Sequence, residues 1–276
     1  MSQKVSSDNI SPYELIYYGG VPGRGEHIRL ALEEAGASYT DTATLPMGEG
    51  REAVTTALEK NPRSQNPPYY APPLFRHGAL TISQTSNILL YLGPKLRLAG
   101  GGEDDVYRVN ALALTALDGL SNEVHDCHHP IAVELYYEEQ KEESHRRSKE
   151  WVKNRLPKHL GYWEKVLTSS EGPWLLGESF TYADLVLFQA SFSFLLLSVR
   201  DPFHAQVPST SPFSNMFAFP KAMGQAKQSG KYDRVFQLWE AVKARPNIAA
   251  YLSSERRQKY DWGIYRYYPE NDVVAD

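Results

Sequence analysis

The sequence predicts an α/β domain, a small mixed sheet with helices packed on it, followed by an all-helical domain. Strand-like and helix-like stretches alternate over the first third of the chain, whereas the periodic stretches after residues 98–105 have helical spacing. Residues 98–105 contain three glycines and three acids, a composition typical of an interdomain linker. With 276 residues, 42% of them hydrophobic, the chain is long enough for two cores.

The first domain is expected to start with a strand, a loop and a helix. Residues 13–18 form an aromatic and aliphatic run that ends at Gly19 and Gly20. From residue 28 onward apolar side chains recur at spacings of three and four, and Gly36 is the expected C-cap.

The rest of the first domain is predicted as a strand, an irregular segment with a short helix, a hairpin and a final helix. The final helix is expected to close at Gly93-Pro94, because this pair is typical of helix ends. The predicted ranges are 38–44 for the strand, 51–60 for the short helix, 73–76 and 79–82 for hairpin strands around His77-Gly78, and 85–92 for the final helix.

The second domain is predicted to be helical throughout. Amphipathic faces within 151–167 and 235–242 indicate helices that pack on one another. Thr181 precedes Asp184 by three residues, an acidic form of the capping box, so we expect a central buried helix in the apolar stretch 183–199. Residues 198–220 are rich in proline and polar residues and predict a long loop that is functional or mobile.

Composition excludes several classes of function. A net charge of -4 with 22% charged residues provides no basic surface for nucleic acid, so small molecules or protein are the expected partners. The apolar stretch is interrupted by Asp184 and serines and falls short of the roughly twenty apolar residues of a membrane span. The polar N-terminus lacks a secretory signal pattern, and the single cysteine, Cys127, excludes an intramolecular disulfide. We therefore expect a cytoplasmic protein with no membrane partner.

Two features near the first helix are candidates for chemistry. Arg24 opens that helix, where backbone N–H groups and a guanidinium can face an anion, although most arginines at helix starts are solvated. Tyr17 and Tyr18 end the first strand, where a hydroxyl could donate to a thiolate. The alternative is an ordinary half-buried aromatic residue of the sheet.

Two further features flank the predicted hairpin. If the Ala71-Pro72 bond is cis, the backbone of Ala71 is an unpaired edge to which a peptide can add, whereas an ordinary trans turn is the commoner arrangement. Gln84 and Thr85 lie at the start of the next helix, where a hydroxyl and free N–H groups suit a small carboxylate. The same residue types also serve as plain N-caps.

The order and spacing of these features resemble the soluble glutathione transferases, closest to the sigma and pi types. Residues 13–36 are similar to that family's tyrosine strand and first helix, with one extra residue between them, and residues 71–93 resemble its cis-proline hairpin and Gln-Ser helix. The capping box at 181–184 also matches. The resemblance runs from about residue 13 to 268, apart from the 198–220 insertion.

The resemblance implies a glutathione transferase fold. The implied parts are a flexible N-terminus at 1–12, a thioredoxin-like glutathione-binding domain at 13–93, a linker at 94–105, an all-helical domain at 106–268 and a flexible tail at 269–276. It also implies a cytosolic homodimer active in detoxification, with glutathione as co-substrate and a small hydrophobic electrophile as the second partner.

The resemblance further implies roles for individual residues. Tyr17 would donate its hydroxyl to the glutathione sulfur, although the extra residue leaves Tyr18 as an alternative, and Arg24 would support that region electrostatically. The other implied contacts are the backbone at Ala71 and Pro72 for the cysteinyl unit, Gln84 and Thr85 for the γ-glutamyl end, and Asp118 for glutathione of the neighbouring subunit. The family's tryptophan and lysine before the hairpin have no clear counterparts, so the glycyl contact stays unassigned.

Three histidines lie on the helix that lines the electrophile pocket in the family. His125, His128 and His129 fall at i, i+3 and i+4, so at least two of them can share a face. We interpret them as pocket-wall groups and expect no metal, because adjacent ligands on one helix rarely converge on one zinc ion. Two alternatives to a glutathione transferase stay open. The stronger one is a non-catalytic ligand-binding protein, and the weaker one is a metal-dependent enzyme built on residues 125–129.

The last aromatic residues, within 260–270, have two interpretations. They can dock onto the helical domain as packing, or they can close over the electrophile pocket. We favour packing, because aromatic side chains bury large areas wherever they dock.

Overall fold

The computed structural model describes residues 12–59, 68–192, 219–258 and 267–274. Four strands within this part form a mixed sheet with the order β2-β1-β3-β4. Strand β1 is parallel to β2 and antiparallel to β3, and β3 is antiparallel to β4. The strands are β1 (Tyr13–Ile16), β2 (Tyr39–Asp41), β3 (Leu74–His77) and β4 (Leu80–Ser83).

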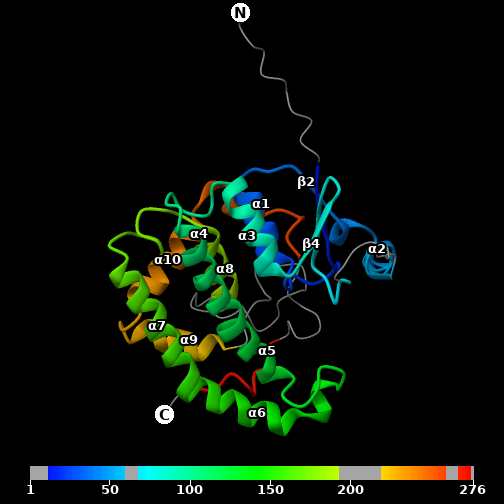
Figure 1. Ribbon diagram of the computed structural model, residues 1–276. Coiled ribbons are helices and arrows are strands. Elements are labelled where there is room, and N and C mark those ends of the chain that lie inside the picture. The colour runs from blue at the N-terminus through cyan, green and yellow to red at the C-terminus, as the bar shows by residue number, and fades with distance from the viewer. Residues whose placement is uncertain (1–11, 60–67, 193–218, 259–266, 275–276) are drawn as a thin grey trace, which may run out of the picture.

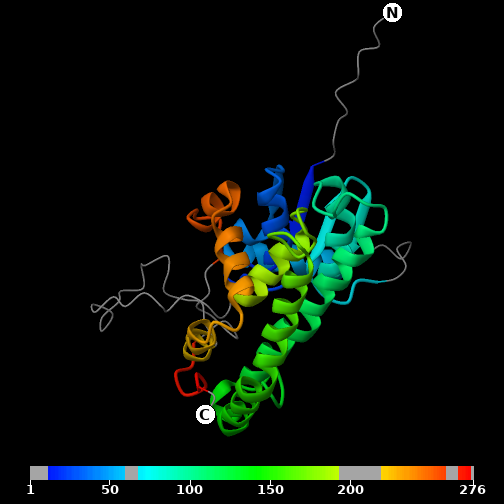
Figure 2. The same ribbon diagram turned by 90° about the vertical axis from the view of Figure 1, so that its left-hand side faces the viewer.

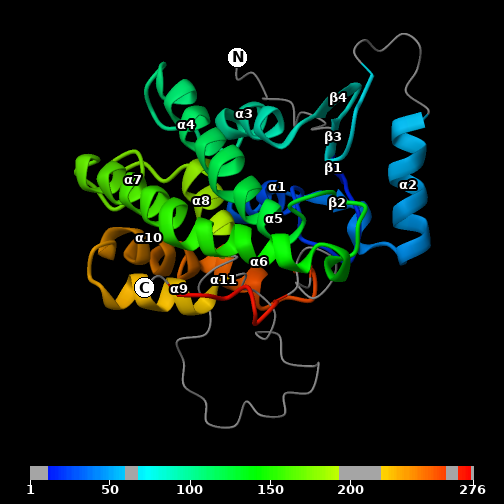
Figure 3. The ribbon, with the colours of Figure 1, turned by 90° about the horizontal axis from the view of Figure 1, so that it is seen from below.

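Helices cover both faces of this sheet (Figure 1). In β1, alternate side chains point to opposite faces, so Leu15 joins the large core with α1 and α3, whereas Ile16 clusters with Val54 of α2. Figure 3 shows α2 on the outer side of the sheet and α1 and α3 on the side of the helical domain. The three helices are α1 (Glu26–Glu34), α2 (Met47–Glu59) and α3 (Thr85–Lys95).

The remainder of the described chain is helical, as predicted, and packs on the α1 and α3 side of the sheet (Figure 2). Helices α4 and α5 are joined by the π-helical turn Thr115–Ser121, and α6 and α7 by the π-helical turn Trp151–Arg155. The helices are α4 (Asp105–Leu114), α5 (Asn122–His128), α6 (Lys141–Glu150), α7 (Leu156–Ser169), α8 (Tyr182–Phe192), α9 (Pro220–Gln228), α10 (Asp233–Lys243) and α11 (Pro246–Leu252).

Helix α8 is the central buried helix that the apolar stretch predicted. The carboxylate of Asp184 accepts hydrogen bonds from the N–H (2.8 Å) and hydroxyl (2.9 Å) of Thr181, which is the carboxylate half of the predicted acidic capping box. The N–H of Asp184 donates to the backbone carbonyl of Thr181 at 3.2 Å and not to its hydroxyl. The carboxylate also accepts a hydrogen bond from the N–H of Leu175 at 2.9 Å. Burial raises the pKa of Asp184 to about 6, against the effect of these donors.

Some predicted boundaries differ from those in the structure. Helix α3 continues past Gly93 and Pro94 to Lys95, because Pro94 removes only one N–H and the N–H of Leu96 still bonds to Leu92. The hairpin turns at Gly78-Ala79 rather than His77-Gly78, since His77 pairs with Leu80. The predicted second strand ends at Asp41 and continues as a 3₁₀ turn.

The prediction of a flexible tail at 269–276 is wrong for the described residues up to 274. Asn271 and Asp272 have exposed fractions of 0% and 3%, because their polar groups find partners on α6 and α9. The flexible N-terminus predicted at 1–12, most of the 198–220 insertion and residues 260–266 of the aromatic segment lie outside the described residues.

No helix in the described ranges has both the length and the apolar character needed to cross a membrane.

Candidate functional site

The hydroxyl of Tyr17 lies under the loop that joins β1 to α1. The ring is buried, with 9% of its surface exposed, and the backbone N–H of Arg24 donates to its hydroxyl oxygen at 3.0 Å. Gly23 makes this approach possible: it has a φ of +49°, and a Cβ there would lie 2.2 Å from the tyrosine oxygen. Tyr18, the alternative candidate, is 38% exposed.

Burial keeps the phenol of Tyr17 neutral. It raises the pKa of Tyr17 above 10.0, and this effect exceeds the opposing ones of the Arg24 N–H and the charges of Arg29 and Arg24. A neutral hydroxyl that accepts from Arg24 still has its own proton to donate. Tyr17 can therefore act as a hydrogen-bond donor to an anion.

Arg24 joins three elements around this hydroxyl. Its carbonyl accepts from the hydroxyl of Thr85, the first residue of α3, at 3.2 Å. Its guanidinium donates to the carbonyl of Leu117 at 3.4 Å and to the side-chain oxygen of Asn122 at the start of α5. The structure thus brings Tyr17, Arg24 and Thr85 together, and the side chain of Arg24 points toward the helical domain.

The start of α3 presents backbone groups to this region. Gln84 is exposed and has φ +70° and ψ 122°, a conformation that costs a non-glycine residue about 1–3 kcal/mol and is common at ligand sites. The side chain of Gln84 accepts no hydrogen bond from the first turn of α3. Gln84 therefore does not cap the N–H groups of that turn. This arrangement suits a carboxylate ligand.

The cis bond lies one residue later than expected. It joins Pro72 to Pro73, so the predicted cis bond between Ala71 and Pro72 is wrong. Two successive prolines in the sequence leave this choice to the surrounding structure. Ala71 and Pro72 are half-buried just before β3, beside β1, and Pro72 has no N–H to donate.

Two of the three histidines lie close together at the end of α5: His125 is on the helix, and His129 is its C-cap, just outside it. The rings of His125 and His129 lie 6.0 Å apart, and His125 is one turn after Asn122, which binds Arg24. Burial lowers the pKa of His125, against the effect of Asp126 and with a further contribution from the Arg24 charge. Burial and the neighbouring His125 likewise lower the pKa of His129. Both imidazoles are therefore neutral at pH 7.

His128 and Asp118 differ in their surroundings. His128 is 3% exposed and packs edge-on against Tyr268 at 5.3 Å, and its place in the pocket wall stays a prediction. Asp118 is exposed on the π-helical turn before α5. In the part of the chain that the structure describes, no group of three or more His, Cys, Asp or Glu side chains is arranged to hold a metal ion.

The geometry can be compared with known proteins. Residues 125–255 match the family model "Glutathione S-transferase, C-terminal domain". The chain is 28% identical over 177 residues to glutathione S-transferase P of Bos taurus, an alignment that covers 63% of this chain and 72% of that protein. It is 23% identical over 252 residues to glutathione S-transferase P 1 of Xenopus laevis, an alignment that covers 90% of this chain and 95% of that protein. The chain is therefore similar to soluble glutathione S-transferases over most of its length.

The fold agrees with this assignment. The Pi-class glutathione S-transferase of Onchocerca volvulus superposes on this chain with a TM-score of 0.56 at 17% identity. The superposition covers 87% of this chain and 91% of the Onchocerca volvulus chain. The glutathione transferase fold predicted from the sequence is confirmed. Of the two types expected, the comparisons support the pi type.

Sequence reasoning missed Arg29, which supports the loop between β1 and α1. Its guanidinium is fully buried, bonds to the carboxylates of Asp41 (2.6 Å) and Glu26 (3.0 Å), and donates to the carbonyl of Pro22 at 3.1 Å. It also lies 5.7 Å from the ring centre of Tyr17. In the sequence, Glu26 and Arg29 are three residues apart on a helix, which is also the spacing of an ordinary surface pair.

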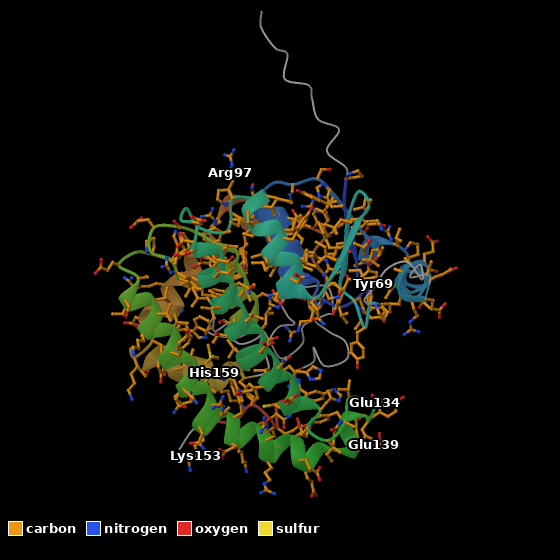
Figure 4. The ribbon with its side chains drawn as sticks, viewed as in Figure 1. Tyr69, Arg97, Glu134, Glu139, Lys153 and His159 are labelled. Carbon is orange, nitrogen blue, oxygen red and sulfur yellow. The ribbon has the colours of Figure 1, made fainter. Side chains whose placement is uncertain are left out.

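Asn122 was missed as well, and no local pattern could have identified it. Its role depends on Arg24, which is 98 residues away in the sequence. One residue further on, Glu123 accepts from Arg155 and lies 3.0 Å from His159, which points into the helical bundle (Figure 4). Helix α5 is thus bound to the first domain through one residue and to α7 through the next.

Proposed function

We propose that the protein is a glutathione S-transferase in which the Tyr17 hydroxyl activates the glutathione thiol for addition to a hydrophobic electrophile, or for its isomerisation. The hydrogen bond from the Arg24 N–H to the Tyr17 oxygen carries this proposal, because it orients a buried, neutral phenol whose proton is free to donate. The similarity to glutathione S-transferases supports the reaction class.

The chemistry required is stabilisation of a thiolate. A free thiol has a pKa of about 8.5 and is mostly protonated at pH 7, and each unit by which its pKa falls is worth about 1.4 kcal/mol. A hydroxyl that donates to the sulfur favours the charged form and lowers this pKa. The charges of Arg24 and Arg29 reach the Tyr17 phenol and favour negative charge in the same place.

The other predicted residues complete the proposed binding site. We propose that the backbone of Ala71 and Pro72 pairs with the cysteinyl unit. Pro72 has no N–H, so it can contribute only its carbonyl to this pairing. Gln84 and the first N–H groups of α3 would hold the γ-glutamyl carboxylate, with Thr85 fixed by its bond to Arg24. The exposed position of Asp118 is compatible with contact to glutathione of a second subunit.

The end of α5, with His125 on the helix and His129 just after it, is the proposed wall for the electrophile. It is joined to the Tyr17 region through Asn122 and Arg24. Neutral imidazoles can donate or accept a hydrogen bond without placing a fixed charge beside an apolar substrate.

Substitution of Tyr17 tests the proposal. We expect Tyr17→Phe to lower kcat/KM for conjugation of glutathione to an aryl halide by roughly 10- to 100-fold, because a hydrogen bond to a charged group is worth about 1.5–3 kcal/mol. Retention on immobilised glutathione should persist. Tyr18→Phe is the matched control and should leave the rate unchanged.

Three results would contradict this assignment. Inactivation by Tyr18→Phe alone would transfer the role to the neighbouring tyrosine. Retention on glutathione without turnover of any electrophile would indicate a binding protein. Loss of activity with a chelator would favour a metal-dependent enzyme on the histidine segment.

A homodimer in the cytoplasm, expected from the resemblance, is likewise proposed. Light scattering coupled to size-exclusion chromatography should give a mass of twice 31.2 kDa. A monomer that conjugates glutathione would exclude the contact proposed for Asp118.

A further inference from the structure

The C-terminal segment Tyr267–Val274 lies between α6 and α9 and reaches α5 (Figure 3). The match to the family's C-terminal domain ends at residue 255, so this segment lies beyond the matched part. Its contacts include those of the Tyr268 ring, the Asn271 amide and the Asp272 carboxylate. Glu270 also pairs with Lys141 of α6 at 2.9 Å, and Val273 packs against the core.

The ring of Tyr268 is packed between two side chains. It stacks on Tyr137 with ring centres 3.7 Å apart and planes 14° apart, and it meets His128 of α5 edge-on at 5.3 Å. Both partners are buried, with exposed fractions of 5% and 3%. Aromatic contacts of this kind contribute roughly 0.5–1.5 kcal/mol beyond the area they bury.

The amide of Asn271 begins a polar chain that ends on the backbone of α5. Its nitrogen donates to the hydroxyl of Ser144 at 2.7 Å, and that hydroxyl donates to the carbonyl of Cys127 at 2.5 Å. Asn271 and Ser144 are both fully buried. Loss of the amide would leave a buried hydroxyl without this donor, which costs about 1–3 kcal/mol.

The carboxylate of Asp272 attaches the segment to α9. It accepts from the backbone N–H of Lys221 at 3.0 Å, in the first turn of α9, and from the hydroxyl of Tyr267 at 2.8 Å. A carboxylate in this place satisfies a free N–H and interacts favourably with the positive end of the helix. The segment is thereby anchored to a helix other than α5 and α6.

Helix α5 is the last segment of a continuous helical run, because α4, the π-helical turn Thr115–Ser121 and α5 follow one another without a break. Helix ends fray, and the C-terminal segment contacts this run at its end. The segment holds Cys127 and His128, which lie between His125 and His129 in the sequence. Whatever fixes the last turn of α5 also fixes the backbone from which His125 and His129 extend, while the Nδ1 of His129 has a partner of its own in the side-chain nitrogen of Gln140 at 3.1 Å.

We propose that Tyr267–Val274 is a clasp that positions His125 and His129 on the electrophile side of the site, with Tyr268 and Asn271 as its positioning residues. The proposal rests on the proposed function for the role of this face, and its structural part stands on the contacts alone. The clasp acts through α5 and contacts neither histidine in the described structure.

Histidine NMR tests the structural part without any need for activity. In wild-type protein His125 faces Asp126, Arg24 and His129, and its pKa is lowered mainly by burial. Tyr268→Ala should loosen the last turn of α5 and move the pKa of His125 toward its ordinary value of 6.5. Tyr268→Phe retains the stacked ring and should titrate like the wild type.

Enzyme kinetics test the functional part. We expect Tyr268→Ala and Asn271→Ala to change the ratio of kcat/KM between a small and a bulky aryl halide at least threefold, with KM for glutathione unchanged. Val274→Ala, a substitution at a 50% exposed position in the same segment, is the matched control and should match the wild type.

Each outcome decides the proposal. Unchanged histidine titrations and an unchanged substrate ratio in both variants, even with lower thermal stability, would show that the segment is packing only and would overturn the clasp. If Tyr268→Ala does not fold, Asn271→Ala carries both measurements. If no electrophile is conjugated even by the wild type, the proposed function fails, while the histidine titration still decides the clasp.

Discussion

At the residue scale, Arg24 shows how one side chain and its own backbone can serve different purposes. Its N–H holds the Tyr17 oxygen and its carbonyl holds Thr85, and any residue at position 24 could supply both groups. Its guanidinium binds Asn122 and the carbonyl of Leu117, so the side chain connects the two domains. The expected electrostatic support of the thiolate is then a long-range effect of the charge.

Gly23 is the residue on which the position of Tyr17 depends most directly. We expect Gly23→Ala to lower the conjugation rate at least tenfold and to destabilise the protein by roughly 1–3 kcal/mol, because its Cβ would overlap the Tyr17 oxygen and its φ is positive. Urea unfolding and aryl halide conjugation measure the two effects.

Gly20 provides the control for this prediction. It has a φ of +81°, but a Cβ there meets no described atom within 4 Å. Gly20→Ala should therefore show the backbone strain alone, with lower stability and a nearly unchanged rate. Equal loss of activity in the two variants would contradict the steric argument.

At the scale of elements, α5 is held by partners from three directions. Asn122 binds Arg24 of the first domain, Glu123 binds Arg155 and His159, and Cys127 receives the hydrogen bond of Ser144. The sequence predicted that this helix carries functional histidines, but a helical pattern identifies a face and leaves open what each face meets.

The carboxylate of Glu123 makes the attachment of α5 dependent on pH. Burial opposes its ionisation, but hydrogen bonds from Arg155 and His159 outweigh this and lower the pKa of Glu123 from 4.5 to about 2. A lowered pKa in the folded state stabilises the protein at pH values above the unfolded pKa, and this stabilisation is lost as the pH falls through the folded one.

We therefore expect wild-type protein to be more stable than Glu123→Gln at pH 7 and pH 5, with a difference that shrinks between about pH 4.5 and pH 2. Urea unfolding of both proteins over this range measures the difference. Glu178→Gln, at an exposed site, should show no such trend. A difference independent of pH would mean that Glu123 contributes through packing alone.

At the scale of the whole molecule, a core cluster extends across both domains. It contains Leu15 of β1, Leu89 of α3, Val186 of α8 and Trp239 of α10. The two domains therefore differ in secondary structure but share one hydrophobic core. The exact limits predicted for the two domains stay predictions.

A buried charged network reinforces this shared core. Glu26 of α1 is fully buried and accepts from Arg29 at 3.0 Å and from the hydroxyl of Tyr251 in α11 at 2.8 Å. It also pairs with Arg257, which bonds to Gln189 of α8 at 3.2 Å. The network joins the first helix of the chain to residues more than two hundred positions later.

We expect Glu26→Gln to destabilise the protein by about 3–5 kcal/mol, because it leaves two buried guanidiniums without part of their counter-charge. Glu33→Gln is the matched control on the same helix. Glu33 is 12% exposed and pairs with Arg256, whose side chain is 58% exposed, and it accepts from the Tyr39 hydroxyl at 2.9 Å. A glutamine oxygen can still accept from Tyr39 and the lost ion pair faces solvent, so this substitution should cost less than about 1 kcal/mol. Urea unfolding measures both, and comparable losses would contradict the role assigned to burial.

The sequence by itself determined the order of the elements, the capping box of α8 and the candidate tyrosine and helix starts. These follow from local spacing, from apolar periodicity and from residue types with strong preferences for turns and caps. The family resemblance covered nearly all of the chain and led to the correct fold.

Only the tertiary structure decided that the cis bond precedes Pro73, that Arg24 reaches Asn122, that His128 packs on Tyr268, and that the tail is docked. In the last three cases a polar or aromatic group chooses among partners tens to hundreds of residues away. Such choices depend on which surfaces packing brings together, and local sequence patterns contain no information about that.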